Sequence, residues 1–147
     1  MNIVNSMKLS FISKSANESF ARSAVAAFLL PLDPTVAEIA DVKTAVSEAV
    51  TNAIVHAYPD TFGTVYIEVK LTDTGRAVIR IRDKGVGIAD IEQAMEPLYT
   101  TSTDERAGLG FAVMQSFMDK VTVRSAVGKG TTVTLEKNII RAAYGSR

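Results

Sequence analysis

The sequence predicts an α/β domain in which helices cover one face of a β-sheet. Apolar residues at steps of three and four run from Val36 to Ile54 and mark one buried face of a long helix. Apolar and polar residues alternate over 65–72 and again over 77–82, and a turn at 73–75 joins these two predicted strands into a hairpin. With 147 residues, 47% of them hydrophobic, the chain is long enough to bury one core.

Charge and composition exclude several classes of protein. Sixteen Lys and Arg balance sixteen Asp and Glu, so we expect neither nucleic acid nor a membrane as a direct partner. The absence of Cys and the presence of one His exclude disulfide frameworks and zinc clusters. The longest apolar stretch, 24–32, is too short to span a bilayer, and we expect no signal peptide ahead of it. We therefore expect a cytoplasmic protein with one domain over 1–147, of which 141–147 is a frayed tail.

The first part of the chain predicts a strand and a helix. Alternation from Met7 to Phe11 indicates a short strand with one buried face. The segment 15–18, Ser-Ala-Asn-Glu, has the spacing of a capping box, and a helix is predicted from there to about Leu30. Glu18 and Arg22 lie one turn apart on its outer side. The side chains that we expect to face inward are Phe20, Ala24, Ala27 and Phe28.

The long helix carries the first candidate site. Asp33 is predicted to cap it, with Pro34 at its first position, and the segment 58–60 ends it. Glu48, Asn52 and His56 follow at four-residue spacing and share a face beside the apolar stripe. A carboxylate one turn before a carboxamide can serve as a base and a metal ligand, but such a pair is also typical of a solvated face. His56 is interpreted as a structural residue of this helix.

The second candidate site follows the hairpin. Asp83 falls on the same side of its strand as Ile79 and Ile81, at the edge of the buried face, where its charge needs hydrogen-bond donors. It either binds a ligand or caps the turn that follows it. Gly85 and Gly87 in that turn allow positive φ and a close approach of the backbone to a flat ligand.

The last third of the chain predicts a lid, a helix and two strands. A short helix at 90–95 ends at Pro97, and the polar segment 99–106 reads as a lid. A helix is predicted to open at Gly108-Leu109-Gly110, where free amides at the positive end of the helix dipole form a phosphate site. Strands at 121–124 and 131–136 complete the sheet. In the simplest interpretation, 128–130 is the hairpin turn between them.

These signals occur in a fixed order, and together they resemble the N, G1 and G2 boxes of the GHKL superfamily. The order is Glu48 with Asn52, then Asp83-x-Gly85-x-Gly87, then Gly108-x-Gly110, then Gly128-x-Gly130-Thr131-Thr132. The resemblance covers nearly the whole chain, from 7 to about 139. It implies the Bergerat fold, a two-layer α/β sandwich of helices on a mixed β-sheet, with ATP or ADP and Mg²⁺ as cofactors.

The resemblance also implies roles for individual residues. Glu48 would be the general base, Asn52 would ligate Mg²⁺, and Asp83 would accept from the adenine amino group. Gly108 and Gly110 would sit at the phosphates. Arg106 would reach the γ-phosphate, although a solvated lid residue is an alternative. The remaining residues that we expect at the cofactor are Gly85, Gly87, Thr100, Thr101 and Thr132; Thr100 and Thr101 could instead be a flexible spacer.

Within the superfamily, the segments 17–22, 46–54 and 97–101 look like the anti-sigma factor serine kinases, above all their sporulation branch that acts on sigma F. Such kinases hold a sigma factor inactive, phosphorylate a STAS-type anti-anti-sigma protein, and form homodimers. Arg22 is the partner-binding residue that this resemblance predicts, the alternative being a solvated partner of Glu18. The rival functions are a binding module without turnover, the detached ATP-binding domain of a sensor histidine kinase, and a general-stress anti-sigma kinase.

Overall fold

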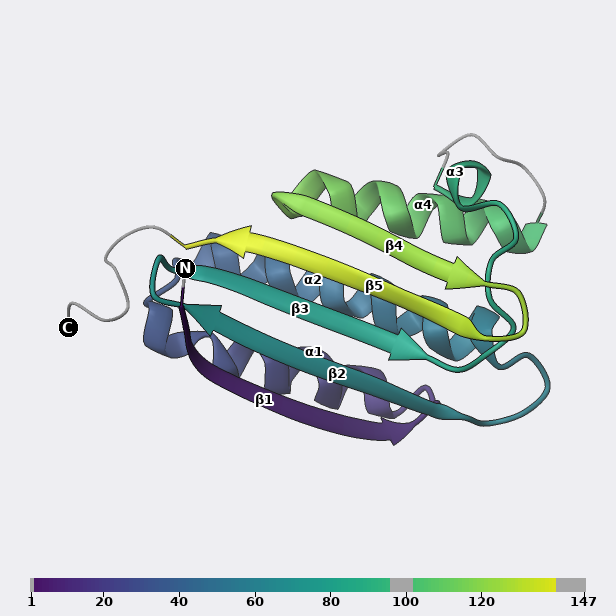
Figure 1. The fold of residues 1–147 in the computed structure, drawn as a ribbon, viewed down its shortest axis with the longest axis horizontal. Coiled ribbons are helices and arrows are strands. Elements are labelled where there is room, and N and C mark those ends of the chain that lie inside the picture. The colour runs from purple at the N-terminus through teal and green to yellow at the C-terminus, as the bar shows by residue number, and fades with distance from the viewer. Residues whose placement is uncertain (1, 96–101, 140–147) are drawn as a thin grey trace.

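Helices cover one face of the β-sheet and leave its other face open in the computed structural model (Figure 1). The structure describes residues 2–95 and 102–139, and for 102–108 it describes the course of the backbone alone. The predicted α/β two-layer sandwich is therefore confirmed, while the predicted tail at 141–147 lies outside the described residues. The elements are β1 (Ile3–Ile12), α1 (Asn17–Phe28), η1 (Leu30–Leu32), α2 (Val36–Asn52), η2 (Ala53–Ala57), β2 (Thr64–Thr72), β3 (Arg76–Asp83), α3 (Ile91–Ala94), α4 (Ser102–Phe117), β4 (Lys120–Ala126) and β5 (Gly130–Asn138).

The described strands lie in the order β1-β2-β3-β5-β4, and every neighbouring pair is antiparallel. The expectation of a mixed sheet is therefore wrong. Two hairpins join β2 to β3 and β4 to β5, and hairpins make antiparallel neighbours. Between β1 and β2 the chain passes through two long helices, which return it to the end of the sheet that β1 has just reached (Figure 1). A crossover through one helix would have made these strands parallel.

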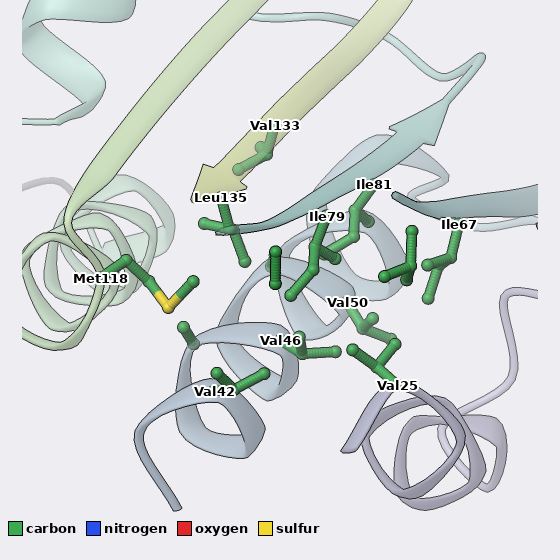
Figure 2. Close-up of a cluster of buried hydrophobic side chains, with 14 of the residues drawn as sticks. Val25, Val42, Val46, Val50, Ile67, Ile79, Ile81, Met118, Val133 and Leu135 are labelled. Atoms are coloured by element: carbon green, nitrogen blue, oxygen red, sulfur yellow. The ribbon is translucent and has the colours of Figure 1, made fainter. Parts of the chain in front are cut away.

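The core lies between the covered face of the sheet and the helices α1, α2 and α4. Figure 2 shows Val42, Val46 and Val50 of α2 facing the side chains of the central strands. Val25 of α1 lies on one side of this row and Met118 on the other. Burying one Val or Ile stabilises the fold by about 1.5–3 kcal/mol, so this row fixes how α2 is rotated against the sheet. The predicted apolar stripe is confirmed, except that Val36 is 88% exposed at the start of α2.

The first helix is rotated by one position from the predicted one. Ala21 and Val25 are fully buried, whereas Phe20 is 56% exposed and Ala27 is also exposed. The expectation that Phe20 and Ala27 face inward is wrong, because α1 turns its smaller side chains towards α2 and can approach it closely. Ala24 is half-buried, as is Phe28.

The capping box lies at the start of α2 and not at the start of α1. Glu38 N–H donates to Thr35 Oγ1 at 3.1 Å, and Thr35 N–H donates to Glu38 Oε1 at 2.9 Å. The first helix begins without a side-chain cap, because Glu18 turns to Arg22 and Ser47 instead. The predicted capping box at 15–18 and the predicted cap at Asp33 with Pro34 are therefore both wrong.

The long helix ends where the sequence predicts, at Tyr58, but by a different geometry. After Asn52 the helix widens into the π-helical turn η2. Asp33, which was expected to start the helix, adopts a left-handed conformation with φ of 57° at the end of η1.

None of the helices in 2–95 and 102–139 is long and apolar enough to cross a lipid bilayer.

Removing the observed capping box should destabilise the protein, whereas removing the predicted one should not. We expect Thr35→Ala to lower the free energy of unfolding by about 1 kcal/mol, because the N–H of Glu38 loses its side-chain acceptor at the helix end. Ser15→Ala is the matched control and should change it by less than about 0.5 kcal/mol, as for an exposed surface position. Urea unfolding followed by circular dichroism measures the free energy of unfolding of both variants. An equal or larger loss in Ser15→Ala would contradict the assignment of the capping box to α2.

Candidate functional site

A pocket of about 390 Å³ opens beside the C-terminal part of α2, against the end of β3 and the loop that follows it. Its wall is mostly apolar, with a small number of polar groups. Such a lining is typical of a small-molecule site in which apolar contact supplies area and the polar groups fix orientation. The polar side chains are Asn52, His56, Asp83, Asp90, Gln93 and Thr131.

Asp83 closes the inner end of this pocket. Its side chain is 7% exposed, and its Oδ1 accepts from the N–H of Gly85 at 3.0 Å and from the N–H of Thr131 at 3.1 Å. Burial raises the pKa of the Asp83 carboxyl group, and the two backbone hydrogen bonds partly offset that rise. Oδ2 has no hydrogen-bond partner within the described residues. One oxygen of Asp83 thus caps the turn, as one interpretation predicted, and the other is left for a ligand.

The loop after Asp83 is held against its neighbours by close backbone contacts. Gly87 lines the pocket with φ of +77°, and a Cβ there would lie 2.2 Å from the carbonyl oxygen of Ala126. Gly85 does not line the pocket, because it lies against the carbonyl oxygen of Ala57, to which Val86 N–H donates at 2.9 Å. Gly85 therefore joins the loop to η2, and only Gly87 of this pair lies at the pocket.

The structure brings Glu48 and Asn52 of α2 together with Gly110 of α4. A Cβ at Gly110 would lie 3.2 Å from both Glu48 Oε2 and Asn52 Nδ2, so the glycine backbone lies directly over the two side chains. Asn52 lines the pocket, and its Nδ2 is buried with no hydrogen-bond partner among the described residues. A buried polar group without a hydrogen-bond partner lowers the stability of the folded protein unless a ligand satisfies it. The Glu48 side chain is half-buried at the edge of the same site.

The expectation that a helix opens at Gly108 is wrong, because α4 already begins at Ser102. Gly108 and Gly110 thus lie inside the helix, and their amides do not form a free helix N-terminus. Gly110 instead serves close packing of α4 on α2.

Other predicted residues lie elsewhere or outside the described part. Thr132 faces the open side of the sheet and lines a different groove, so it does not belong to this pocket. Thr131 takes its place, and strand alternation could have found it, because Thr131 shares the face of buried Val133. Thr100 and Thr101 lie outside the described residues, as does the side chain of Arg106.

The structure places His56 at the pocket and pairs Arg22 with Glu18. His56 lies in η2 and lines the pocket, so the π-helical turn presents it towards any ligand. Arg22 donates to Glu18 Oε1 at 3.2 Å and to Ser47 Oγ at 3.4 Å, and its side chain remains 40% exposed. The predicted pairing with Glu18 is present, and the half-exposed guanidinium still has donors to offer.

The donor set at this site fits a hard divalent cation held together with phosphate oxygens. Such ions take carboxylate and amide oxygens and retain several waters. Glu48 and Asn52 supply one of each oxygen, while the unpartnered Nδ2 of Asn52 is a donor that can bind a phosphate oxygen but not the cation. No cluster of three or more His, Cys, Asp or Glu side chains that could hold a metal is found in the described residues.

The sequence over residues 13–137 matches the family described as "Histidine kinase-like ATPase domain". The chain is 55% identical over 142 residues to the Anti-sigma F factor of Caldanaerobacter subterraneus subsp. tengcongensis, covering 96% of this chain and 99% of that protein. It is 53% identical over 140 residues to the Anti-sigma F factor of Geobacillus thermodenitrificans, covering 94% and 95%. With that of Clostridium botulinum Eklund 17B it shares 56% identity over 135 residues, covering 90% and 94%.

The fold is also similar to solved structures. The structure of the RsbU and RsbW domains of Rv1364c from Mycobacterium tuberculosis matches 95% of this chain with a TM-score of 0.69 at 19% identity. The chain spans 34% of that protein's length. The blue-light activated histidine kinase of Erythrobacter litoralis EL346 matches 73% of this chain and 32% of its own, with a TM-score of 0.56 at 23% identity. At these identities the likeness concerns the fold alone.

The role of Asp83 can be tested separately from its contribution to stability. Asp83→Asn keeps an oxygen that can accept from the N–H groups of Gly85 and Thr131 but loses the charge. If Asp83 binds the amino group of a nucleotide base, we expect nucleotide binding to weaken by about 1–3 kcal/mol. Calorimetric titration with ATP measures this, and an unchanged affinity would contradict the assignment.

Asp83→Asn should also change how the stability of the nucleotide-free protein depends on pH. Because the pKa of Asp83 is raised in the folded state, its contribution to stability is present below the usual Asp pKa and is lost as pH rises through the raised value. The Asn variant has no such titration. We therefore expect its melting temperature, relative to the wild type without nucleotide, to increase from acidic to neutral pH. A variant less stable than the wild type only at neutral pH would contradict this sign.

Proposed function

The chain belongs to the histidine kinase-like ATPase domain family and, within it, to the anti-sigma F factors, and on this premise we propose that it is an ATP-dependent serine kinase that also inhibits a sigma factor. In this proposal it binds sigma F and phosphorylates a serine of a STAS-type anti-anti-sigma protein, giving ADP and phosphoserine. It works in the cytoplasm as a homodimer of single-domain chains. The names of the relatives support the sigma factor, and the site geometry supports the kinase.

The observation that carries the kinase proposal is the meeting of Glu48 and Asn52 beneath Gly110, at the edge of a pocket that ends in Asp83. In the proposed complex, Asp83 Oδ2 accepts a hydrogen bond from the adenine amino group. The apolar wall around it, which includes Ala53 and Ile88, contacts the faces of the base and excludes water. A base without an amino donor at that position would leave a buried carboxylate oxygen unpaired, which favours ATP over GTP.

Asn52 would hold the metal through its amide oxygen. Mg²⁺, when bound, would neutralise charge on the phosphate groups. Gly110 lets α4 pack against Glu48 and Asn52 with no side chain between them, and this contact fixes where the two polar groups lie relative to the pocket. Thr100, Thr101 and Arg106 keep their proposed places at the phosphates, with Arg106 stabilising charge on the γ-phosphate.

Glu48 lies one helical turn before Asn52 and would act as the general base. Its carboxylate accepts the proton of the incoming serine hydroxyl while the serine oxygen forms a bond to the γ-phosphorus. The bond from that phosphorus to the bridging oxygen breaks, and ADP leaves with its electron pair. Packing of α2 on the sheet fixes the backbone of both residues, so base and metal ligand stay at one spacing.

The rival functions differ in which side chain, if any, receives the γ-phosphate of ATP. A binding module without turnover has no use for a carboxylate at position 48, beside the proposed metal ligand. A histidine-kinase fragment would pass phosphate to a separate histidine, and His56 of this chain is part of the pocket wall. Incubation with γ-labelled ATP and a purified STAS protein separates the three: acid-stable serine label supports the proposal, whereas no label or acid-labile label contradicts it.

Substitution of Glu48 and of Asn52 should have different consequences. We expect Glu48→Ala to bind Mg-ATP with nearly wild-type affinity yet to lose about two to four orders of magnitude in the rate of phosphoryl transfer, the usual contribution of a general base. Asn52→Ala should also lose the metal-dependent part of nucleotide binding. Calorimetry with and without Mg²⁺ and single-turnover transfer to the STAS protein measure the two effects. Near-wild-type transfer by Glu48→Ala would exclude it as the base.

Arg22 gives a test of the partner proposal that leaves the nucleotide site intact. A guanidinium can pair with a carboxylate on either partner through a planar pair of donors. We expect Arg22→Glu to abolish binding of both the sigma factor and the STAS protein by repulsion as well as lost pairing. Loss of the half-exposed pair with Glu18 and the like-charge repulsion that replaces it should each cost about 0.3–0.5 kcal/mol of stability.

Surface plasmon resonance with each partner, alongside calorimetry with ATP, measures the effect of Arg22→Glu. Lys129→Glu, a charge reversal of the same size at an exposed turn, is the matched control and should bind both partners as the wild type does. Full-strength binding of both partners by Arg22→Glu would leave Arg22 as a solvated partner of Glu18.

A further inference from the structure

The helices leave one face of the sheet open (Figure 1). Residues of that face line a groove of about 850 Å³. It lies on the opposite side of the sheet from the nucleotide pocket, and nothing in the proposed function uses it. The chain as a whole has equal numbers of basic and acidic residues. The groove does not: one carboxylate, Glu68, lines it together with the basic side chains of Lys8, Arg80, Arg82, Lys120 and Arg124.

The strand register places two arginines on either side of a threonine. Arg82 of β3 is opposite Thr132 of β5, and Thr132 is opposite Arg124 of β4. Directly opposite residues of antiparallel strands share a face, with Cβ atoms about 4.5–5.5 Å apart. The two guanidinium groups therefore flank one hydroxyl in a row across three strands. We call Arg82, Thr132 and Arg124 the arginine row.

The charge of the arginine row is not neutralised from within the groove. Glu68 is already shared by three cations, with its oxygens 3.6 Å from Lys8 Nζ, 3.7 Å from Lys70 Nζ and 3.8 Å from Arg80 NH1. Among the described residues, neither Arg82 nor Arg124 has a carboxylate within ion-pair distance. Two positive charges on one face without acidic neighbours create a local field that attracts anions, although the chain as a whole is neutral.

An aromatic ring holds one end of the row in place. The guanidinium of Arg82 lies 4.8 Å from the centre of the Tyr66 ring, and Lys84 Nζ lies 5.2 Å from the same centre. A cation over an aromatic ring keeps its charge, and the contact restricts the motion of the long side chain. The donors of Arg82 are thus partly ordered before any ligand arrives, which lowers the entropy lost on binding.

We propose that the open face of the sheet is a docking surface for an acidic protein segment, whose carboxylates pair with Arg82 and Arg124. Each guanidinium offers two parallel N–H donors to a carboxylate, and the hydroxyl of Thr132 between them donates to a further oxygen. Carboxylates on alternate residues of an extended segment point to one side, as the guanidinium groups of the row do. This docking does not depend on the kinase reaction, because no residue of the row lines the nucleotide pocket.

Two other occupants fit the groove less well. A second copy of this chain, packed face to face, would bring five basic side chains and one carboxylate from each copy into one interface, and this excess of like charge disfavours it. A nucleic acid strand would place phosphates along the groove past Glu68 in its middle. It would also find no free stacking platform among the described lining residues, since the ring of Tyr66 is already in contact with Arg82 and Lys84.

The proposal is tested with a fluorescein-labelled peptide of alternating Glu and Gly, whose binding to the full chain is followed by fluorescence anisotropy. We expect salt-sensitive binding that the double variant Arg82→Gln/Arg124→Gln weakens by about tenfold or more, the effect of losing two charge pairs. The matched control is Lys14→Gln/Lys129→Gln, which removes the same charge from positions that do not line the groove. Binding of the control should stay within about twofold of the wild type.

Other outcomes overturn the proposal. Equal peptide binding by the wild type and the arginine double variant would mean that the row does not bind carboxylates. Tighter binding of an oligothymidine of equal charge, lost in the same variant, would make the surface a nucleic acid site. A changed sedimentation coefficient of the variant would make it an interface between copies. ATP affinity, measured by calorimetry, should be unaffected; its loss in the variant would mean that the open face and the pocket are not independent.

Discussion

The rotation of α2 about its own axis is the constraint on which the rest of the structure depends. Val42, Val46 and Val50 point into the core opposite the central strands (Figure 2), and a helix with one face fixed has no freedom left for the others. Glu48 and Asn52 must therefore point towards α4. Any rotation that moved them would expose several Val side chains, each at a cost of about 1.5–3 kcal/mol. Packing energy in the core thus holds the proposed catalytic residues in place.

At the other end of the pocket the order comes from polar contacts. The carboxylate of Asp83 is buried and accepts from two amides, one in the following loop and one in β5. Tyr58 strengthens the same junction, since its hydroxyl accepts from Lys84 N–H at 2.7 Å and donates to the carbonyl of Thr64 at 2.8 Å. Burial raises the pKa of Tyr58 as well. The loop after β3 is therefore fixed to η2 and to two strands before a ligand binds, so a flat ligand would meet a preformed wall.

The sequence was sufficient where one local period decides the outcome. Strand alternation placed Asp83 at the edge of the buried face, and the apolar stripe of α2 placed Glu48 and Asn52 on a shared face beside it. The predicted helix caps were wrong because 15–18 and 35–38 both have the spacing of a capping box. A contact between Glu18 and Ser47, which are distant in the sequence, decides between them. The prediction that Thr132 lies at the cofactor was wrong for a simpler reason, because the alternation that buries Val133 assigns Thr131 to the pocket. That Gly110 packs on Glu48 and Asn52 follows only from how α4 lies on α2.

The same alternation that separates Thr131 from Thr132 also separates the two binding surfaces. Asp83 and Thr131 face the pocket, whereas their chain neighbours Arg82 and Thr132 face the open groove. In each strand the backbone is shared, but successive side chains point to opposite sides of the sheet. A ligand on the open face would therefore meet none of the groups that we propose contact the nucleotide. A change in charge at Arg82 would reach the pocket only through the backbone of β3 and β5, which the two faces share. One small sheet can therefore carry a separate proposed binding surface on each of its faces.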